Sequence, residues 1–252
     1  MSVAARHDLT AIQIDDVSVR FGGLTALDSV NATIAAGDSF GIIGPNGAGK
    51  TTLLNVVSGL LRPSSGEVRY QGERITGLRA NSVAQLGLGR SFQLAEGFAN
   101  FTVFDYVQLG LAAVSADRRS GMTRARRIDE CTMALEQVGL QSSAGRLMGT
   151  LPYGAKKLVD LCRVVVSGPS VLLLDEPTSG LSSDERAEMV GHLTAFKGDP
   201  QNPRTIVVVD HDVEFISSVT QRMLALAHGQ VLVDGAPNEV LSNSRVVDAY
   251  LG

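Results

Sequence analysis

The sequence predicts an α/β fold in which helices cover a parallel core sheet, an antiparallel β subdomain precedes that sheet, and an α-helical subdomain is inserted into it. Three observations point to this fold. A glycine-rich stretch at residues 44–52 lies between a short apolar run and a segment that can continue as a helix. Residues 171–174 and 206–209 are fully apolar, which is typical of parallel strands covered on both faces, and each run is followed by an acidic residue. Residues 94–166 show helical periodicity without a convincing strand.

The composition is that of a globular protein. The chain has 252 residues, 44% of them hydrophobic and 19% charged, so we expect a single domain over residues 1–252 that contains the inserted subdomain at about 94–166. The net charge of −4 argues against a broad nucleic-acid surface, which usually has a basic balance, and we expect no nucleic-acid partner. Cys131 and Cys162 match no metal-site or disulfide spacing.

Targeting signals are not evident in the chain. Residues 1–10 lack the apolar stretch of a signal peptide, and no run approaches the roughly 18 apolar residues that span a bilayer. We therefore expect a chain that is soluble by itself and reaches a membrane only through a partner.

The first elements are expected to be antiparallel strands. Residues 11–21 alternate apolar and polar positions with a break near Asp15 and Asp16, and a second strand is expected at residues 26–34. Phe21, at the end of the first strand, could offer a flat apolar face to an adenine ring or be an ordinary hairpin aromatic. The pattern alone leaves both interpretations open.

The glycine-rich stretch matches G-x-x-x-x-G-K-[ST], the P-loop, and it follows a buried strand expected at residues 39–43. Glycines let the backbone turn several N–H groups toward one phosphate, and the following helix adds its positive N-terminal end. Lys50 supplies a full charge, and the Thr51 hydroxyl can ligate Mg²⁺. The residues expected to bind the nucleotide are Gly44, Pro45, Asn46, Gly47, Ala48, Gly49, Lys50, Thr51 and Thr52.

The remaining elements follow from turn signals and periodicity. We expect a hairpin at residues 67–75, a helix at 80–86 and a strand at 88–93, and then helices from 103, at 122–138 and at 153–166. The apolar strand at 171–174, a helix at 183–196, the apolar strand at 206–209, a hairpin around Gly229 and a helical tail over 238–251 complete the chain.

Polar residues follow two of the apolar strands and should lie at the edge of the sheet where the P-loop lies, because ligands bind outside the carboxyl ends of parallel strands. Asp175 is placed to hold Mg²⁺ directly or through water, and Glu176 could orient the attacking water. Alternatively, Asp175 and Glu176 could be an ordinary helix cap or surface acids. His211 could contact the γ-phosphate or make a structural hydrogen bond. Gln93 could reach Mg²⁺ or the water, or be an ordinary amide at a strand end.

These motifs together resemble those of ABC-transporter ATPase subunits, and the resemblance covers nearly the whole chain. Residues 44–51 correspond to the Walker A motif and residues 171–175 to the Walker B motif. The resemblance implies a P-loop NTPase (RecA-like) core that binds ATP and Mg²⁺. It further implies that Glu176 is the catalytic base, Gln93 the Q-loop glutamine, His211 the switch histidine and Phe21 the adenine-stacking aromatic.

The signature motif departs from the family pattern. Where Leu-Ser-Gly-Gly-Gln is usual, this chain has Leu151, Pro152, Tyr153, Gly154 and Ala155. In the family this motif contacts the γ-phosphate across a dimer interface, and proline offers neither a hydroxyl nor an N–H group. The resemblance thus implies the loss of one charge-assisted hydrogen bond, about 1.5–3 kcal/mol, which would slow turnover or weaken ATP-driven dimerisation. Lys156 and Lys157 add positive charge nearby.

A closer resemblance is to the ATP-binding subunits of branched-chain amino acid importers, with urea and amide importers as competitors. It lies in residues 20–24, Ala26-Leu27, the Leu-Pro-Tyr-Gly signature and the final Ala249-Tyr250-Leu251-Gly252. It implies transmembrane permease subunits, a second identical or paralogous ATPase subunit and, indirectly, an extracytoplasmic solute-binding protein as partners. It also implies a peripheral location on the cytoplasmic face of the membrane.

Two other functions compete with import. A soluble ABC ATPase acting on DNA or ribosomes would need a long coiled-coil insert or a second P-loop domain, and neither is evident. A regulatory module that binds ATP but barely hydrolyses it is suggested by the altered signature, whereas Glu176 and His211 argue against it.

Overall fold

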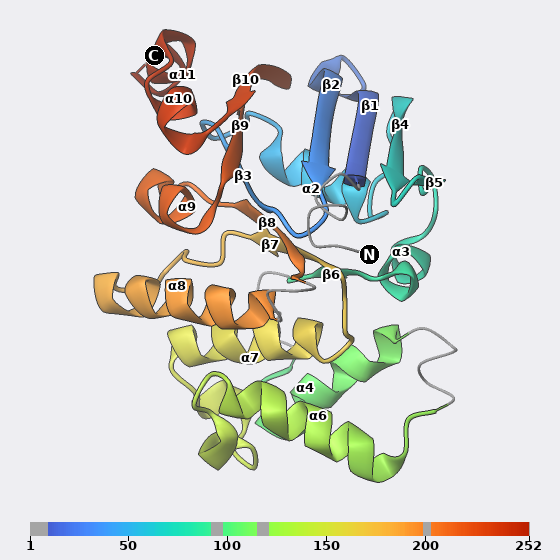
Figure 1. The fold of residues 1–252 in the computed structure, drawn as a ribbon, viewed down its shortest axis with the longest axis vertical. Helices are drawn as coiled ribbons and strands as arrows, with labels where there is room; N and C mark the ends of the chain where they lie inside the picture. Colours follow the sequence, from blue (N-terminus) through green and yellow to red (C-terminus); the bar gives the residue numbers. More distant parts are fainter. Residues whose placement is uncertain (1–9, 92–97, 115–120, 199–202, 252) are drawn as a thin grey trace.

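The computed structural model describes residues 10–91, 98–114, 121–198 and 203–251, which form two sheets and a layer of helices. Figure 1 shows the smaller sheet beside the core sheet and the helices between residues 103 and 197 stacked below. The α/β architecture expected from the sequence is confirmed.

The smaller sheet is antiparallel and has the strand order β2-β1-β4-β5. The register of β1 shifts between Ile14 and Val17, where Asp16 takes a φ of 50°, so the expected break at this point is confirmed. Its strands are β1 (Thr10–Phe21), β2 (Leu24–Ala35), β4 (Ser65–Tyr70) and β5 (Glu73–Arg74).

The core sheet has the order β10-β9-β3-β8-β7-β6. All neighbouring strands are parallel except β9 and β10, which form the expected hairpin. Because β8 lies between β3 and β7, the carboxyl ends of these three strands meet at one edge. The strands are β3 (Ser39–Ile43), β6 (Leu88–Arg90), β7 (Val171–Asp175), β8 (Thr205–Val209), β9 (Arg222–Ala227) and β10 (Gln230–Gly235).

Both faces of the core sheet are buried, which explains the continuous apolar runs. Leu172 and Leu174 of β7 pack into a cluster with the helices below, whereas Leu173 packs into a second cluster with β1, β2 and the helix after the P-loop. Alternate residues of one strand therefore serve two different cores.

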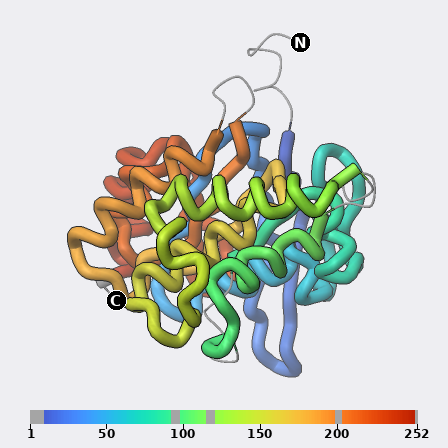
Figure 2. Tube along the Cα trace, turned by 90° about the horizontal axis from the view of Figure 1, so that it is seen from below, coloured from blue at the N-terminus to red at the C-terminus, as the bar shows by residue number. Residues whose placement is uncertain are grey.

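The helices fall on both sides of the sheet. Seen from below, α4 and α6 lie nearest the viewer, in front of the sheets (Figure 2). The helices are α2 (Lys50–Val57), α3 (Ala80–Leu86), α4 (Val103–Leu109), α6 (Arg124–Glu136), α7 (Tyr153–Val165), α8 (Ser183–Lys197), α9 (Val213–Val219), α10 (Pro237–Leu241) and α11 (Ser244–Leu251). Short 3₁₀ turns are η2 (Gly110–Ala113), η3 (Gln141–Ser143) and η4 (Met148–Thr150). Within the described ranges, no helix has the length and hydrophobicity needed to cross a bilayer.

Two expectations about the helices were wrong in detail. The helical tail is divided into two helices, because α10 ends at Leu241 and the Asn243 side chain accepts a hydrogen bond from Arg245 N at 3.0 Å, at the start of α11. Helix α6 begins two residues later than expected, since Thr123 caps it. Its Ile128 is 42% exposed, although helical spacing had grouped it with buried residues.

Gly110 allows η2 to pack directly on α7. A Cβ atom at this position would lie 1.7 Å from the Arg163 carbonyl oxygen and 2.7 Å from Val166 Cγ2. We expect Gly110→Ala to lower the free energy of unfolding by about 1–3 kcal/mol or more, because a backbone atom cannot move aside as a flexible side chain can. Urea denaturation followed by circular dichroism measures this change.

The matched control is Gly191→Ala in the middle of α8, where a Cβ atom would have no neighbour within 4 Å. Here we expect a gain of about 0.5–1 kcal/mol from the better helix former. A Gly110→Ala variant as stable as the native chain would contradict the packing of η2 on α7.

Candidate functional site

The glycine-rich loop lies between β3 and α2, where it was expected. Gly44, Gly47 and Gly49 take φ values of 151°, 80° and 103°, a left-handed range that side chains with a Cβ atom rarely adopt. Helix α2 begins at Lys50, so the N–H groups of its first turn have no partner within the helix. The loop thus joins unpaired helix N–H groups to a tightly turned backbone, an arrangement that favours phosphate.

Lys50 lies at the centre of the site. Its side chain is 8% exposed, and Nζ donates to the carbonyl oxygens of Gly44 at 2.6 Å and Pro45 at 3.0 Å. Burial lowers the pKa of this ammonium group, while the nearby carboxylates of Glu176, Asp175 and Asp210 act in the opposite direction. The ends of β3, β7 and β8 therefore bring together one cation and three acids, as the sequence predicted for Lys50, Asp175 and Glu176.

Asp175 forms an ion pair that was not predicted. Arg90 Nη2 donates to Asp175 Oδ2 at 2.9 Å, and Arg90 Nη1 donates to Ser58 Oγ at 2.7 Å. Burial lowers the pKa of Arg90, and the charge of Asp175 opposes that shift. A basic residue at the end of a short buried strand, three positions before Gln93, was the signal in the sequence that could have revealed it.

The backbone of Glu176 is held from two sides. Its N–H donates to Val209 O at 2.7 Å, and its carbonyl oxygen accepts from Lys157 Nζ at 2.6 Å. Glu176 has a φ of 48°, unusual for a residue with a side chain, and such outliers cluster at functional sites. Lys157, which the sequence placed near the signature, thus contacts the carboxyl end of β7 in its own chain.

Asp210 organises the neighbouring strand end. This residue is fully buried, and its Oδ2 accepts from Thr178 Oγ1 at 2.6 Å and from Thr178 N at 3.1 Å. Its Oδ1 accepts from His211 N at 2.8 Å and lies 3.2 Å from His211 Nδ1. His211 itself is more than half exposed. One ring nitrogen of His211 thus makes a structural contact with Asp210, while the ring stays accessible to a phosphate. The geometry is compatible with both hypotheses for His211, a structural hydrogen bond and a contact to the γ-phosphate.

The altered signature forms the start of α7. Pro152 is the N-cap residue and offers no side-chain hydrogen bond, and both Pro152 and Tyr153 are exposed. The Tyr153 ring lies against Gly180, and a Cβ atom at Gly154 would fall 2.3 Å from Glu185 Oε1. In the described part of the chain, no hydrogen bond joins residues 151–155 to the P-loop. Leu151 is buried and Ala155 half-buried.

Ser182 has a structural role. Ser182 is the N-cap of α8 and forms a capping box with Glu185, whose backbone N donates to Ser182 Oγ and whose side chain accepts from Ser182 N. The exposed start of α7 therefore lies beside the start of α8, which the capping box holds in place.

Two further sequence-predicted residues stand apart. Phe21 is 51% exposed at the tip of the β1–β2 hairpin, so its ring can be covered by a ligand or a partner. Gln93 lies outside the described residues, as do residues 94–97 of the segment that links it to α4. The roles assigned to both remain predictions.

Tyr250 was known from the sequence only as part of a terminal motif. In the fold, α11 brings its hydroxyl to the first glycine of the P-loop, where Tyr250 Oη accepts from Gly44 N at 2.8 Å. Burial raises the pKa of this phenol. The loop is thus held by a residue about 200 positions away.

The site offers oxygen donors that suit Mg²⁺ bound together with a nucleotide. Asp175 supplies a carboxylate and Thr51 an exposed hydroxyl. Among the described residues, no group of three or more His, Cys, Asp or Glu could form a metal cage. Mg²⁺ at phosphate sites typically uses one or two carboxylates, and phosphates and water complete its shell.

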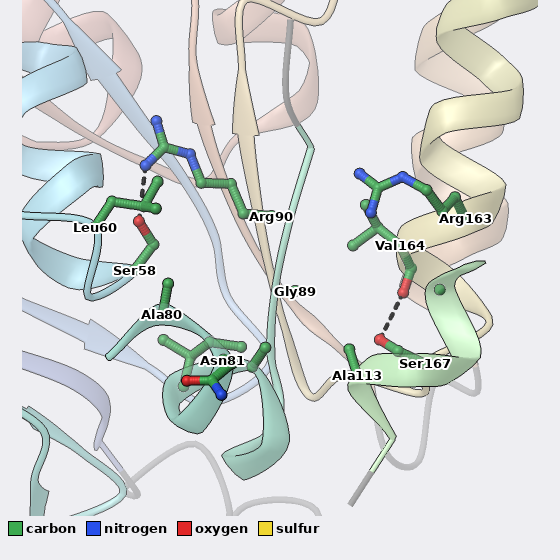
Figure 3. A pocket seen from close by; sticks show the side chains of 13 residues that line it. Ser58, Leu60, Ala80, Asn81, Gly89, Arg90, Ala113, Arg163, Val164 and Ser167 are labelled. Atoms are coloured by element: carbon green, nitrogen blue, oxygen red, sulfur yellow. Dashed lines mark hydrogen bonds between the residues drawn. The ribbon is translucent and has the colours of Figure 1, made fainter. Parts of the chain in front are cut away.

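A cavity of about 230 Å³ lies on the other side of Arg90. Figure 3 shows β6 crossing it, with Ser58, Leu60, Ala80 and Asn81 on one side and Ala113, Arg163 and Ser167 on the other. Arg163 is held by Asp160, which is buried and accepts from Arg163 Nη2 at 2.8 Å and from Tyr106 Oη at 2.8 Å. Two arginines thus line this cavity, and each is paired with an aspartate.

Comparison with known proteins gives matches along the whole chain. The ABC transporter family model matches residues 27–179. The chain is 30% identical to the high-affinity branched-chain amino acid transport ATP-binding protein BraF of Pseudomonas aeruginosa, over 96% of this chain and 97% of that protein. LivG of Escherichia coli, named for the same transport, gives the same identity and coverage. The sulfate/thiosulfate import ATP-binding protein CysA 2 of Shewanella oneidensis is 34% identical over 91% of this chain, but the match covers 63% of that protein.

Solved structures agree in fold. MJ1267, an ATP-binding cassette of an ABC transporter, superposes with a TM-score of 0.87 at 25% identity and covers 97% of this chain and 100% of its own. A nucleotide-free cassette from an ABC transporter superposes with a TM-score of 0.85 at 24% identity, over 97% of this chain and 100% of its own, and it supports the fold alone.

Proposed function

The chain belongs to the ABC transporter family, and from that premise we propose that it is the ATP-binding and ATP-hydrolysing subunit of an importer for branched-chain amino acids. The observation that carries the proposal is the meeting of Lys50 with the carboxylates of Asp175 and Glu176 at one edge of the core sheet. A P-loop cation and two acids at neighbouring strand ends are the parts that phosphoryl transfer from ATP requires.

The roles of the residues follow from their positions. The N–H groups at the start of α2 and the ammonium of Lys50 bind the phosphates. Glu176, held by its backbone, orients the attacking water, and His211 faces the γ-phosphate while Asp210 fixes its ring. Mg²⁺, held through Asp175, Thr51 and Gln93, would neutralise charge on the phosphate oxygens. Phe21 would stack on the adenine.

The exposed start of α7 completes the site from a second subunit. Residues 151–155 make no hydrogen bond to the P-loop of their own chain among the described residues, and the helix N-terminus after Pro152 offers backbone N–H groups to a phosphate. ATP binding then closes a pair of identical or paralogous subunits, and hydrolysis opens it. This motion drives transmembrane permease subunits, which hold the chain at the cytoplasmic face of the membrane.

The cargo proposal depends on the extent of the match. BraF and LivG are matched over nearly their full length, whereas CysA 2 is more identical but is matched over 63% of its length. A urea or amide importer is the nearest alternative. A regulatory ATP-binding module is a second candidate, because Pro152 removes a hydroxyl and an N–H group from the signature.

Uptake by the assembled importer tests the cargo. The chain, its permease subunits and the solute-binding protein are placed in vesicles, and ATP-driven accumulation of labelled leucine is compared with that of labelled urea and acetamide. We expect leucine uptake that depends on internal ATP. Accumulation of urea or acetamide with no leucine uptake would reject branched-chain amino acids as the cargo.

The cavity beside Arg90 is the proposed docking site for the permease subunits, since it lies between β6 of the core and η2 and α7 of the helical layer. We expect Ala84→Arg, which places a bulky charged side chain on the wall of this cavity, to weaken association with the permeases by roughly 10- to 100-fold. ATP binding by the isolated chain should not change. Pull-down with detergent-solubilised permeases measures the association.

Gln85→Arg is the matched control, because Gln85 is the next residue on α3, is exposed and does not line the cavity. Equal loss of association in both variants would show that any added charge on α3 weakens the binding of the permeases, and would reject the cavity as their docking site.

A further inference from the structure

Arg90 connects the cavity of Figure 3 to the carboxylate of Asp175. It ends β6, pairs in parallel register with Leu173, and lines the cavity. Its guanidinium extends toward Ser58, which lines the same cavity (Figure 3). One side chain therefore borders both the proposed docking site and the nucleotide site.

The contacts of Arg90 fix Asp175 relative to the P-loop helix. Its Nη2 binds one carboxylate oxygen, Asp175 Oδ2, at 2.9 Å, and its Nη1 binds Ser58 Oγ at 2.7 Å. Ser58 Oγ in turn donates to Leu54 O at 2.7 Å, at the end of the helix that begins with Lys50. The two side chains of the ion pair are only 7% and 12% exposed, so water competes little for these bonds.

We propose that Arg90 is a positioning residue that orients Asp175 toward Mg²⁺, and that filling the neighbouring cavity stabilises this orientation. The inference rests on the proposed function, because it takes Asp175 as the metal-side carboxylate. With Oδ2 bound to the guanidinium, the carboxylate keeps one orientation, and Oδ1 is the oxygen that would hold the metal. Partners outside the first coordination shell typically change metal affinity by about 10- to 100-fold when mutated.

The planar fork of arginine is essential to this role. A guanidinium can donate to Ser58 and Asp175 at once, whereas the ammonium of lysine keeps the charge but lacks the fixed pair of donors. The variant Arg90→Lys therefore keeps the positive charge at this position but removes the fixed pair of donors that orients Asp175.

The first test is the Mg²⁺ requirement for ATP binding by the full chain, measured by titration calorimetry over a series of free Mg²⁺ concentrations and with a chelator. For Arg90→Lys we expect the Mg²⁺ concentration for half-maximal enhancement of ATP binding to rise about tenfold. The affinity for ATP in the presence of chelator should stay at the native value. An unchanged Mg²⁺ requirement would overturn the positioning role.

Arg163→Lys is the matched control, because Arg163 lines the same cavity and also pairs with a buried aspartate, Asp160, at 2.8 Å. Asp160 joins α7 to Tyr106 of α4 and is not among the residues that we propose to hold Mg²⁺. We expect this variant to keep the native Mg²⁺ requirement. Equal shifts in both variants would reduce the role of Arg90 to general packing and overturn the proposal.

The second test adds the permease subunits in detergent. In the native chain we expect them to lower the Mg²⁺ requirement about fivefold or more, and in Arg90→Lys to leave it unchanged. A native requirement that permeases do not alter, or an equal drop in both chains, would overturn the link to the cavity. A native chain that binds no ATP at any Mg²⁺ concentration would instead contradict the proposed function itself.

Discussion

Replacement of Glu176 by glutamine is expected to abolish turnover and leave nucleotide binding in place. Glutamine keeps the shape of the side chain but cannot accept a proton from the attacking water. The backbone at this position is fixed by Val209 and Lys157, so the substitution should not displace the strand end. We expect phosphate release to fall by about 10²- to 10⁴-fold, the usual contribution of a general base.

The same variant should accumulate as an ATP-bound closed dimer, because dimer opening depends on hydrolysis. Size-exclusion chromatography with light scattering and a nucleotide assay on the dimer peak measures this state. Glu188→Gln, an exposed change on α8, is the matched control and should hydrolyse ATP at the native rate. Native turnover by Glu176→Gln would show that another group is the base.

Replacement of Lys50 by alanine is expected to remove nucleotide binding first and turnover as a consequence. The ammonium is the cation that Glu176, Asp175 and Asp210 surround, and its loss leaves three carboxylates facing an anionic ligand. We expect the affinity for ATP to fall by roughly 10- to 100-fold, since one charge-assisted hydrogen bond is worth about 1.5–3 kcal/mol. Fluorescent nucleotide titration measures the affinity.

Lys197→Ala is the matched control for this loss of charge. Lys197 is also a lysine whose pKa is lowered by burial, and its Nζ donates to Ser39 Oγ at 3.0 Å, at the opposite end of β3. We expect native affinity for ATP in that variant. An equal loss in both variants would mean that Lys50 acts through the stability of β3 rather than through the phosphates.

The sequence allowed the elements around the P-loop to be predicted closely. The strand expected at residues 39–43 is β3 (Ser39–Ile43), because turn signals bound the apolar run and the motif fixes where the helix begins. The buried strands β7 and β8 were equally clear, since both faces of the sheet are covered and every position is apolar.

The contacts that shape the site could not be predicted in the same way. Arg90 and Asp175 are 85 positions apart, and Gly44 and Tyr250 are 206 positions apart. Periodicity reports which residues are buried, but it does not tell which strands are neighbours or where a distant helix returns. The pairing of Arg90 with Asp175 depends on β6 lying beside β7, which only the assembled sheet defines.

The tail shows a local limit of the same kind. A helical tail was expected over residues 238–251, and the structure divides it into α10 and α11. The capping side chain of Asn243 interrupts it, and the short restart of α11 is what carries Tyr250 to the P-loop.

Phosphate release by the purified chain, measured with ATP and Mg²⁺ and with and without its permease subunits, tests the ATPase assignment most directly. We expect release that requires Mg²⁺, increases with the permeases and falls to background in Glu176→Gln. A chain that binds ATP yet releases no phosphate even with its permeases would contradict the assignment and favour the regulatory module that Pro152 suggests.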